Sequence, residues 1–177
     1  FRSLGFIAPE TFFVKASLNN SKSTFIFQES TEKEMLERNL KREGPIFEGD
    51  ESLLWYYKNY DLFELESVSL ARLDNDSWAE KNSIAALISL KSFIKIQNAY
   101  LEYANRQSNK NFMTEYYIQH NILNKNDIFI KYHALLLAMN GVHGLRPHNR
   151  KFYYNVFNRD FEPIYYDGDL FLYDNLL

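Results

Sequence analysis

The chain has 177 residues and a formal net charge of −3, with 20 basic against 23 acidic side chains. Hydrophobic residues make up 46% of it and aromatic residues 17%, which is enough for one substantial core and argues against a disordered chain. Because the charge is balanced and no long basic block occurs, a role in binding nucleic acid or anionic membranes has no electrostatic support. The absence of cysteine excludes disulfides and thiolate metal sites. No apolar run approaches the ~20 residues that a helix needs to span a bilayer.

Residues 1–7 are typical of the end of a helix, because Gly5 can terminate the helix and Pro9 discourages its continuation. A helix end at this point, in a chain that opens on Phe1 rather than Met, predicts a fragment of a longer protein.

Two runs rich in Phe, Val, Ile and Thr follow, at residues 11–18 and 23–28. They are separated by Asn19 and Asn20, which favour a tight turn, so the sequence predicts a β-hairpin.

A short charged helix is expected next. Thr31 with Glu34 three places on forms a capping box, and Gly44 and Pro45 would end the helix after Glu43. The charges alternate along this segment, which predicts a solvated face with the apolar side chains turned inward; these are Met35, Leu36 and Leu40.

The run IFEGDES at residues 46–52 is predicted to be a loop. Its acidic residues Glu48, Asp50 and Glu51 do not have calcium-loop spacing, so we expect them to face solvent.

The middle of the chain is predicted to be helical. Residues 53–63 are dense in aromatic side chains and would pack as a helix in the core or form a substrate-facing wall. Ser77 and Glu80 form a second capping box, and residues 78–105 carry apolar side chains around much of the circumference, the pattern of a largely buried helix. A short aromatic helix is expected at residues 112–119.

A further helix is expected from Asp127 to Asn140, with Gly141 as its C-terminal exit. This helix would deliver the chain to a polar loop that begins near His143, and His133 within it is expected to be a packed structural histidine.

Two aromatic-rich runs near the end, residues 151–157 and 161–166, predict an antiparallel hairpin that turns at residues 158–160. Strands rise only ~3.3 Å per residue, so folding back brings the groups on either side of the hairpin close together. The polar residues that flank the hairpin and are expected to meet in this way form the candidate site; they are His143, His148, Asn149, Asp167 and Asp169.

Asn149, Asp167 and Asp169 offer only oxygen ligands, the set that magnesium accepts alongside water and phosphate oxygens. A phosphorylated co-substrate would fit such a site. His143 or His148 would supply a base, since imidazole titrates near neutrality, and spacing alone does not decide between them. The alternative is that the Asp-Gly-Asp segment is only a turn with solvated carboxylates.

Three segments of the chain resemble those of a known protein family. The segments HNRKFYYN and FEPIYYDGD, in this order, are similar to the spore-coat-H-type (CotH) family of atypical bacterial kinases. A second similarity lies in FFVKASLNNSKSTFIFQESTEKEMLE, where Glu29, Lys33 and Leu36 match the family's segment after a hairpin.

The resemblance implies an α+β, protein-kinase-like fold. Its incomplete small lobe would be residues 1–29, a helix end and a β-hairpin, and its mostly helical large lobe would be residues 30–177, with a catalytic-loop hairpin. It also implies transfer of the γ-phosphoryl group of ATP to a hydroxyl of a protein or small molecule, with magnesium held by Asn149 and Asp167 and assisted by Asp169. The adenine would be met by a hinge at Phe27, Gln28, Glu29 and Ser30. The family's setting would be the bacterial cell surface or secretion.

One departure from the kinase pattern bears on activity. Gly144 stands where the pattern has its catalytic aspartate, five places before Asn149. Either His143 takes over as the proton acceptor, or the chain is a pseudokinase-like nucleotide-binding or interaction module without catalysis. A metal-dependent hydrolase that uses the histidines with Asp167 and Asp169 is the remaining alternative.

Overall fold

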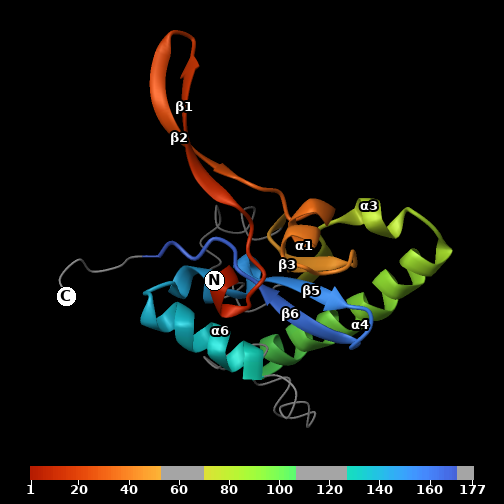
Figure 1. The fold of residues 1–177 in the computed structure, drawn as a ribbon. Helices are drawn as coiled ribbons and strands as arrows, with labels where there is room; N and C mark the ends of the chain where they lie inside the picture. Colours follow the sequence, from red (N-terminus) through yellow and green to blue (C-terminus); the bar gives the residue numbers. More distant parts are fainter. Residues whose placement is uncertain (53–69, 107–126, 171–177) are drawn as a thin grey trace.

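The computed structural model describes residues 1–52, 70–106 and 127–170. In this part of the chain, two antiparallel sheets combine with helices in an α+β architecture (Figure 1). The elements are, in order, the 3-10 turn η1 (Arg2–Leu4), strands β1 (Thr11–Leu18) and β2 (Ser21–Gln28), helix α1 (Lys33–Arg38), strands β3 (Ile46–Asp50) and β4 (Leu70–Leu73), helices α3 (Asp76–Ala79), α4 (Ser83–Arg106) and α6 (Asp127–Ala138), 3-10 turns η4 (Val142–Leu145) and η5 (Pro147–Asn149), and strands β5 (Lys151–Asn155) and β6 (Asp160–Ile164).

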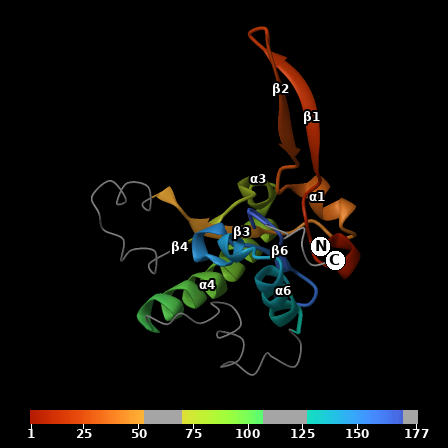
Figure 2. The same ribbon diagram turned by 90° about the vertical axis from the view of Figure 1, so that its left-hand side faces the viewer.

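The larger sheet has the strand order β4-β3-β5-β6, and each neighbouring pair is antiparallel. Its side chains alternate between two covered faces. Helices α4 and α6 lie beside one face, as Figures 1 and 2 show from two directions. The buried residues of this layer are Phe47, Ala71, Ile96, Ala99, Tyr100, Phe129, Phe152, Tyr154 and Phe161.

The opposite face of this sheet is covered by α1 and by the segment before β1. Ile7 bridges to Ile164 at the edge of β6, and Met35 and Leu36 of α1 are fully buried. Together with Ile46 and Tyr153 these residues form a second, smaller core. Residues ahead of the first hairpin therefore belong to the body of the molecule.

Strands β1 and β2 form a separate two-stranded sheet that stands away from the body in both views (Figures 1 and 2). The predicted hairpin is confirmed, with Asn19 and Asn20 in the left-handed region at φ 49° and 65°. Phe12 and Phe27 face each other across the strands, with ring centroids 4.8 Å apart. Since a lone hairpin is marginally stable in water, such cross-strand contacts carry much of its stability.

The 3-10 turn η1 ends at Gly5 as predicted, whereas helix α1 ends earlier than predicted. Gly5, at φ 86°, closes the single 3-10 turn η1. Helix α1 ends at Arg38 rather than at Glu43, because Leu40 turns into the left-handed region at φ 57° and is 95% exposed. The predicted capping box is also wrong, since the Thr31 hydroxyl donates to Asp74 instead.

Residues 46–52 are not a loop. Ile46 to Asp50 form β3, an inner strand of the larger sheet, and Glu48 is only 6% exposed. The prediction failed because Gly49 and the acidic residues resemble a turn in composition, whereas two flanking strands and ion-pair partners decide the local structure.

The long helix predicted at residues 78–105 is two helices, α3 and α4. Asn82 caps α4 by accepting bonds from the amides of Ile84 and Ala85, so the Ser77 capping box is not the start of the long helix. The buried face of α4 is lined largely by small side chains, while several of its large apolar residues are about half exposed: Ile84, Leu87, Leu90 and Ile94.

Helix α6 starts at Asp127 as predicted, and its exit is made by Asn140, at φ 55°, just before Gly141. Tyr132 and Leu136 of this helix are buried against Phe6. The helices expected at residues 53–63 and 112–119 lie outside the described residues. In the ranges that the structure describes, no helix is both long and apolar enough to cross a membrane.

Candidate functional site

A row of charged side chains crosses the larger sheet on the face that α1 covers. Glu48 of β3 lies directly opposite Arg72 of β4 on one side and Lys151 of β5 on the other. The Arg72 Nε donates to Glu48 Oε1 at 2.5 Å, and the Lys151 Nζ lies 2.6 Å from Glu48 Oε2. Glu48 therefore has one cationic partner for each of its oxygens.

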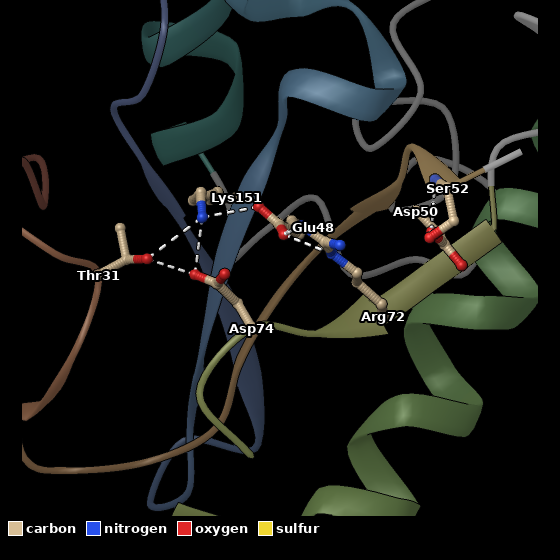
Figure 3. A network of polar contacts seen from close by, with 7 residues as sticks. All are labelled: Thr31, Glu48, Asp50, Ser52, Arg72, Asp74 and Lys151. Carbon is tan, nitrogen blue, oxygen red and sulfur yellow. Dashed lines mark hydrogen bonds and ion pairs between the residues drawn. The ribbon is translucent and has the colours of Figure 1, made fainter. Parts of the chain in front are cut away.

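Lys151 extends this network beyond the sheet (Figure 3). Its Nζ lies 2.7 Å from Oδ2 of Asp74, at the end of β4, and 3.2 Å from Oγ1 of Thr31, in the segment between β2 and α1. The Thr31 hydroxyl donates to the same Asp74 oxygen. The three protons of the ammonium group thus have three acceptors, on three different segments.

The network lies largely away from water. The side chains of Lys151 and Glu48 are 7% and 8% exposed, and that of Asp74 is 15% exposed. Burial on its own lowers the pKa of Lys151, but the bonds to Asp74 and Glu48 and their negative charges outweigh it, so the pKa is raised above its ordinary value. The ammonium also lies 4.5 Å from the centre of the Tyr166 ring. Lys151 is therefore charged at neutral pH.

A cavity of about 450 Å³ opens beside this network. Its volume falls within the range of small-molecule pockets. The residues lining it are Gln28, Glu29, Ser30, Thr31, Glu32, Asp74, Lys151 and Tyr166. The pKa of Glu32 is raised, chiefly by partial burial and further by the negative charges of Asp74 and Asp76. The wall is therefore polar and rich in carboxylates.

Of the expected hinge residues, Gln28, Glu29 and Ser30 line this cavity. Glu29 is held in place, because its carboxylate accepts from the amide of Glu10 and pairs with Arg38 at 2.8 Å. Phe27 is 51% exposed and packs against Phe12 on the hairpin.

A second group of candidate residues meets at the open end of the β5–β6 hairpin. The predicted hairpin is confirmed, although its strands are shorter than expected and Asp160 belongs to β6 rather than to the turn. The Nε2 of His143 lies 3.1 Å from Oδ2 of Asp167, and the Asn149 side-chain amide donates to the His143 carbonyl at 3.1 Å. His143 thus touches two of the three residues that were predicted to bind magnesium, Asn149 and Asp167.

The segment after β6 has an unusual backbone. Asp167 and Asp169 are both left-handed, at φ 43° and 44°, and both are exposed, while Gly168 between them is buried. Gly144 packs against this turn, since a Cβ built on it would lie 3.1 Å from Gly168 Cα and from the Tyr166 carbonyl oxygen. An aspartate side chain at position 144 would therefore require the turn to move.

His148 lies deeper than His143. It is 8% exposed, and its backbone packs on Gly49 of β3, where an added Cβ would come within 2.5 Å of His148 Cα. The same turn is fixed from the other side by Tyr100, whose hydroxyl donates to the Pro147 carbonyl at 2.7 Å. Burial raises the pKa of Tyr100 well above its ordinary value, so this donor stays protonated. Asn149 follows on the same rigid turn.

The side chains at the open end of the hairpin offer oxygen ligands, which suit magnesium better than a transition metal. The Asn149 side chain uses its amide nitrogen for the hydrogen bond to His143, so its oxygen could bind a metal ion. The carboxylates of Asp167 and Asp169 are exposed. Among the residues that the structure describes, no group of three or more His, Cys, Asp or Glu has the arrangement to hold a metal ion. Magnesium commonly binds through one or two protein oxygens and completes its shell with water and phosphate.

Sequence reasoning found the hairpin residues and missed the buried network. Lys151 was expected only to begin a strand, Glu48 was expected in solvent, and Asp74 was not considered. The alternation of Ile46, Glu48 and Asp50 could have indicated that Glu48 is buried, because in a strand these three side chains lie on the same face of the sheet.

Comparison of the chain with protein-family models, with curated proteins and with solved structures found no match.

Proposed function

We propose that this chain is an atypical, CotH-like kinase, which transfers the γ-phosphoryl group of a nucleoside triphosphate to a hydroxyl group. ATP is the donor that the resemblance implies, and a protein is the acceptor that it implies. Magnesium would be held by Asn149 and Asp167, with Asp169 beside them.

The observation that carries this proposal is the cavity beside the charged row. Three of the four residues expected to meet the nucleotide line it, namely Gln28, Glu29 and Ser30. Tyr166 also lines it and immediately precedes Asp167. We therefore expect a nucleotide whose base occupied this cavity to direct its phosphates toward Asp167, the residue after Tyr166.

In phosphoryl transfer the protein mainly positions the reacting groups and stabilises their charge. In phosphoryl transfer the metal ion neutralises charge on the phosphate oxygens, and the protein aligns donor and acceptor. The turn that carries Asn149 is held by Tyr100 and by the close packing at Gly49, so the amide oxygen has a fixed position. His143, 42% exposed and bonded to Asp167, would accept the proton of the attacking hydroxyl.

The alternative is a nucleotide-binding module without transfer activity. It is favoured by Gly144, which stands at the position of the kinase aspartate and where an added Cβ would lie 3.1 Å from Gly168 Cα. In that case the cavity and the metal ligands would still bind nucleotide and magnesium.

The decisive experiment measures phosphoryl transfer from radiolabelled ATP and GTP to a generic protein acceptor and to water, with magnesium. Asn149→Ala and Asp167→Ala should each lower the rate by about 100-fold or more while the fold is kept. Asn158→Ala, on the exposed turn of the same hairpin, is the matched control and should have no effect. Equal rates for all four proteins would refute the kinase assignment. Magnesium-dependent nucleotide binding without transfer would favour the alternative.

A further inference from the structure

The hairpin of β1 and β2 has two unlike faces. Residues that lie directly opposite each other on paired strands share a face, and neighbours along one strand alternate between faces. The pair of Phe12 and Phe27 therefore marks one face, which we call the apolar face; on β1 its residues are Phe12, Val14, Ala16 and Leu18. The opposite face, toward the tip of the hairpin, is the basic face; its residues there are Lys15, Ser17, Lys22 and Thr24.

In the ranges that the structure describes, neither face is covered. Every residue of the two strands is exposed except Val14, which is half-buried. This includes large apolar side chains, such as Phe13 at 77% and Leu18 at 66%. The hairpin stands away from the body in Figures 1 and 2, and among the described strands each of the two has one edge without a hydrogen-bonded neighbour. An open edge of this kind is a template for a further strand.

The charges on the hairpin are all of one sign. Residues 11–28 contain Lys15 and Lys22 and no acidic residue, whereas the whole chain has a net charge of −3. The two lysines share the basic face and line a hollow of about 530 Å³, together with Ala16, Ser17, Ser23 and Thr24. An acidic partner would therefore be attracted to the hairpin and repelled by the rest of the chain.

The same arrangement disfavours two other occupants. A second copy of the hairpin would bring lysines only to lysines, and lysine on an open edge commonly prevents such edge-to-edge pairing. A bilayer in contact with the apolar face would lie on the side away from Lys15 and Lys22. Burial of the aromatic rings and attraction to anionic lipid would then not be gained together.

We propose that the open edge of β1 binds an extended acidic segment of a partner protein as a third strand of this sheet. Side chains of the partner would alternate, with apolar residues beside Phe12, Val14 and Leu18 and acidic residues on the basic face with Lys15 and Lys22. Backbone hydrogen bonds to the edge supply affinity, and the alternation supplies specificity. This binding does not require phosphoryl transfer.

The first test uses synthetic peptides of eight residues, the length of β1. One alternates valine and glutamate, the second alternates valine and lysine, and the third has the composition of the first with its valines and glutamates in two blocks. Fluorescence anisotropy with the full 177-residue chain should show the alternating acidic peptide binding at least about 5-fold more tightly than either of the others. Its affinity should fall as the salt concentration rises, and bound peptide should slow amide hydrogen exchange at residues 11–18.

The second test reverses the charge of the basic face. The double variant with Lys15→Glu and Lys22→Glu should prefer the alternating lysine peptide to the alternating glutamate peptide. The matched control combines Lys91→Glu and Lys131→Glu, which changes the net charge equally on exposed residues of α4 and α6. It should keep the preference of the unmodified chain for the acidic peptide.

Other outcomes would overturn the proposal. Equal affinities for the alternating and block acidic peptides, or no binding of either, would show that β1 does not add an acidic strand. Dimerisation in sedimentation experiments with residues 11–18 protected would give the edge to a second copy, and binding to phosphatidylserine vesicles with the hairpin protected would give it to a membrane. If the double variant loses its fold, as circular dichroism would reveal, the peptide series on the unmodified chain still decides. None of these measurements involves a nucleotide, so their failure leaves the phosphotransferase proposal intact.

Discussion

Replacement of Lys151 by methionine keeps an unbranched side chain that is one atom shorter and removes the charge. The change would leave Glu48 and Asp74, which are 8% and 15% exposed, without the cation that lies 2.6 and 2.7 Å from them. Removing one partner of a buried ion pair costs about 3–5 kcal/mol, because the remaining charge is uncompensated. Glu48 keeps Arg72 and Asp74 keeps Thr31, so we expect the lower end, about 3 kcal/mol.

This loss is large against the total stability of a typical domain, ~5–15 kcal/mol. Urea denaturation followed by circular dichroism should show the midpoint falling, and the thermal midpoint should drop by about 6–12 °C. Lys33→Met is the matched control, since Lys33 pairs with Glu37 at 3.5 Å and both side chains are about half exposed. Its effect should stay below about 0.5 kcal/mol.

The reasoning also predicts coupling. Once Glu48 is replaced by glutamine, loss of the Lys151 charge should cost at least about 1 kcal/mol less than it does in the unmodified chain. A stability of Lys151→Met equal to or above that of the unmodified protein would refute the view that this network holds the cavity wall.

Four more changes follow from the same structure. Gly49→Ala would bring a Cβ to 2.5 Å from His148 Cα, so we expect a loss of about 1–3 kcal/mol in denaturation and a displaced Asn149, seen as weaker magnesium-dependent nucleotide binding. Tyr100→Phe should cost about 1–2 kcal/mol, measured in the same way, because the Pro147 carbonyl loses its donor. Glu32→Gln should raise the thermal midpoint slightly at pH 7, since it removes repulsion from Asp74 and Asp76. The raised pKa of Lys151 stabilises the fold fully below the ordinary lysine pKa of ~10.4 and is lost as pH rises through the folded-state value, so thermal scans between pH 9 and 12 should show a steeper decline for the unmodified chain than for Lys151→Met.

Local patterns predicted the elements whose partners are near in sequence. The first hairpin was correct because Asn19 and Asn20 specify its turn, and the second because its aromatic runs flank a short polar turn. The gathering of His143 and Asp167 follows directly from that second fold-back. In each case, the residues that carry the signal are no more than 24 positions apart.

Elements decided by distant partners were missed. Glu48 is buried because Arg72 and Lys151 come to either side of it, and nothing within a few residues of Glu48 indicates either. Thr31 has the sequence of a helix cap, yet its hydroxyl bonds to Asp74, which a local rule cannot anticipate. The network beside the cavity is therefore a product of tertiary structure.

The strand order of the larger sheet has a consequence for how the protein is made. Strand β3 pairs with β5, so the hydrogen bonds between these strands cannot form until the chain has been made as far as Tyr153, the partner of Ile46. Closing so long a loop carries an entropic cost and slows folding. On the ribosome, the first hairpin can form soon after it emerges, whereas Lys151 joins Glu48 only after the long segment between them has been made. The acidic side chains of β3 would remain hydrated until then, which guards an early strand against premature aggregation.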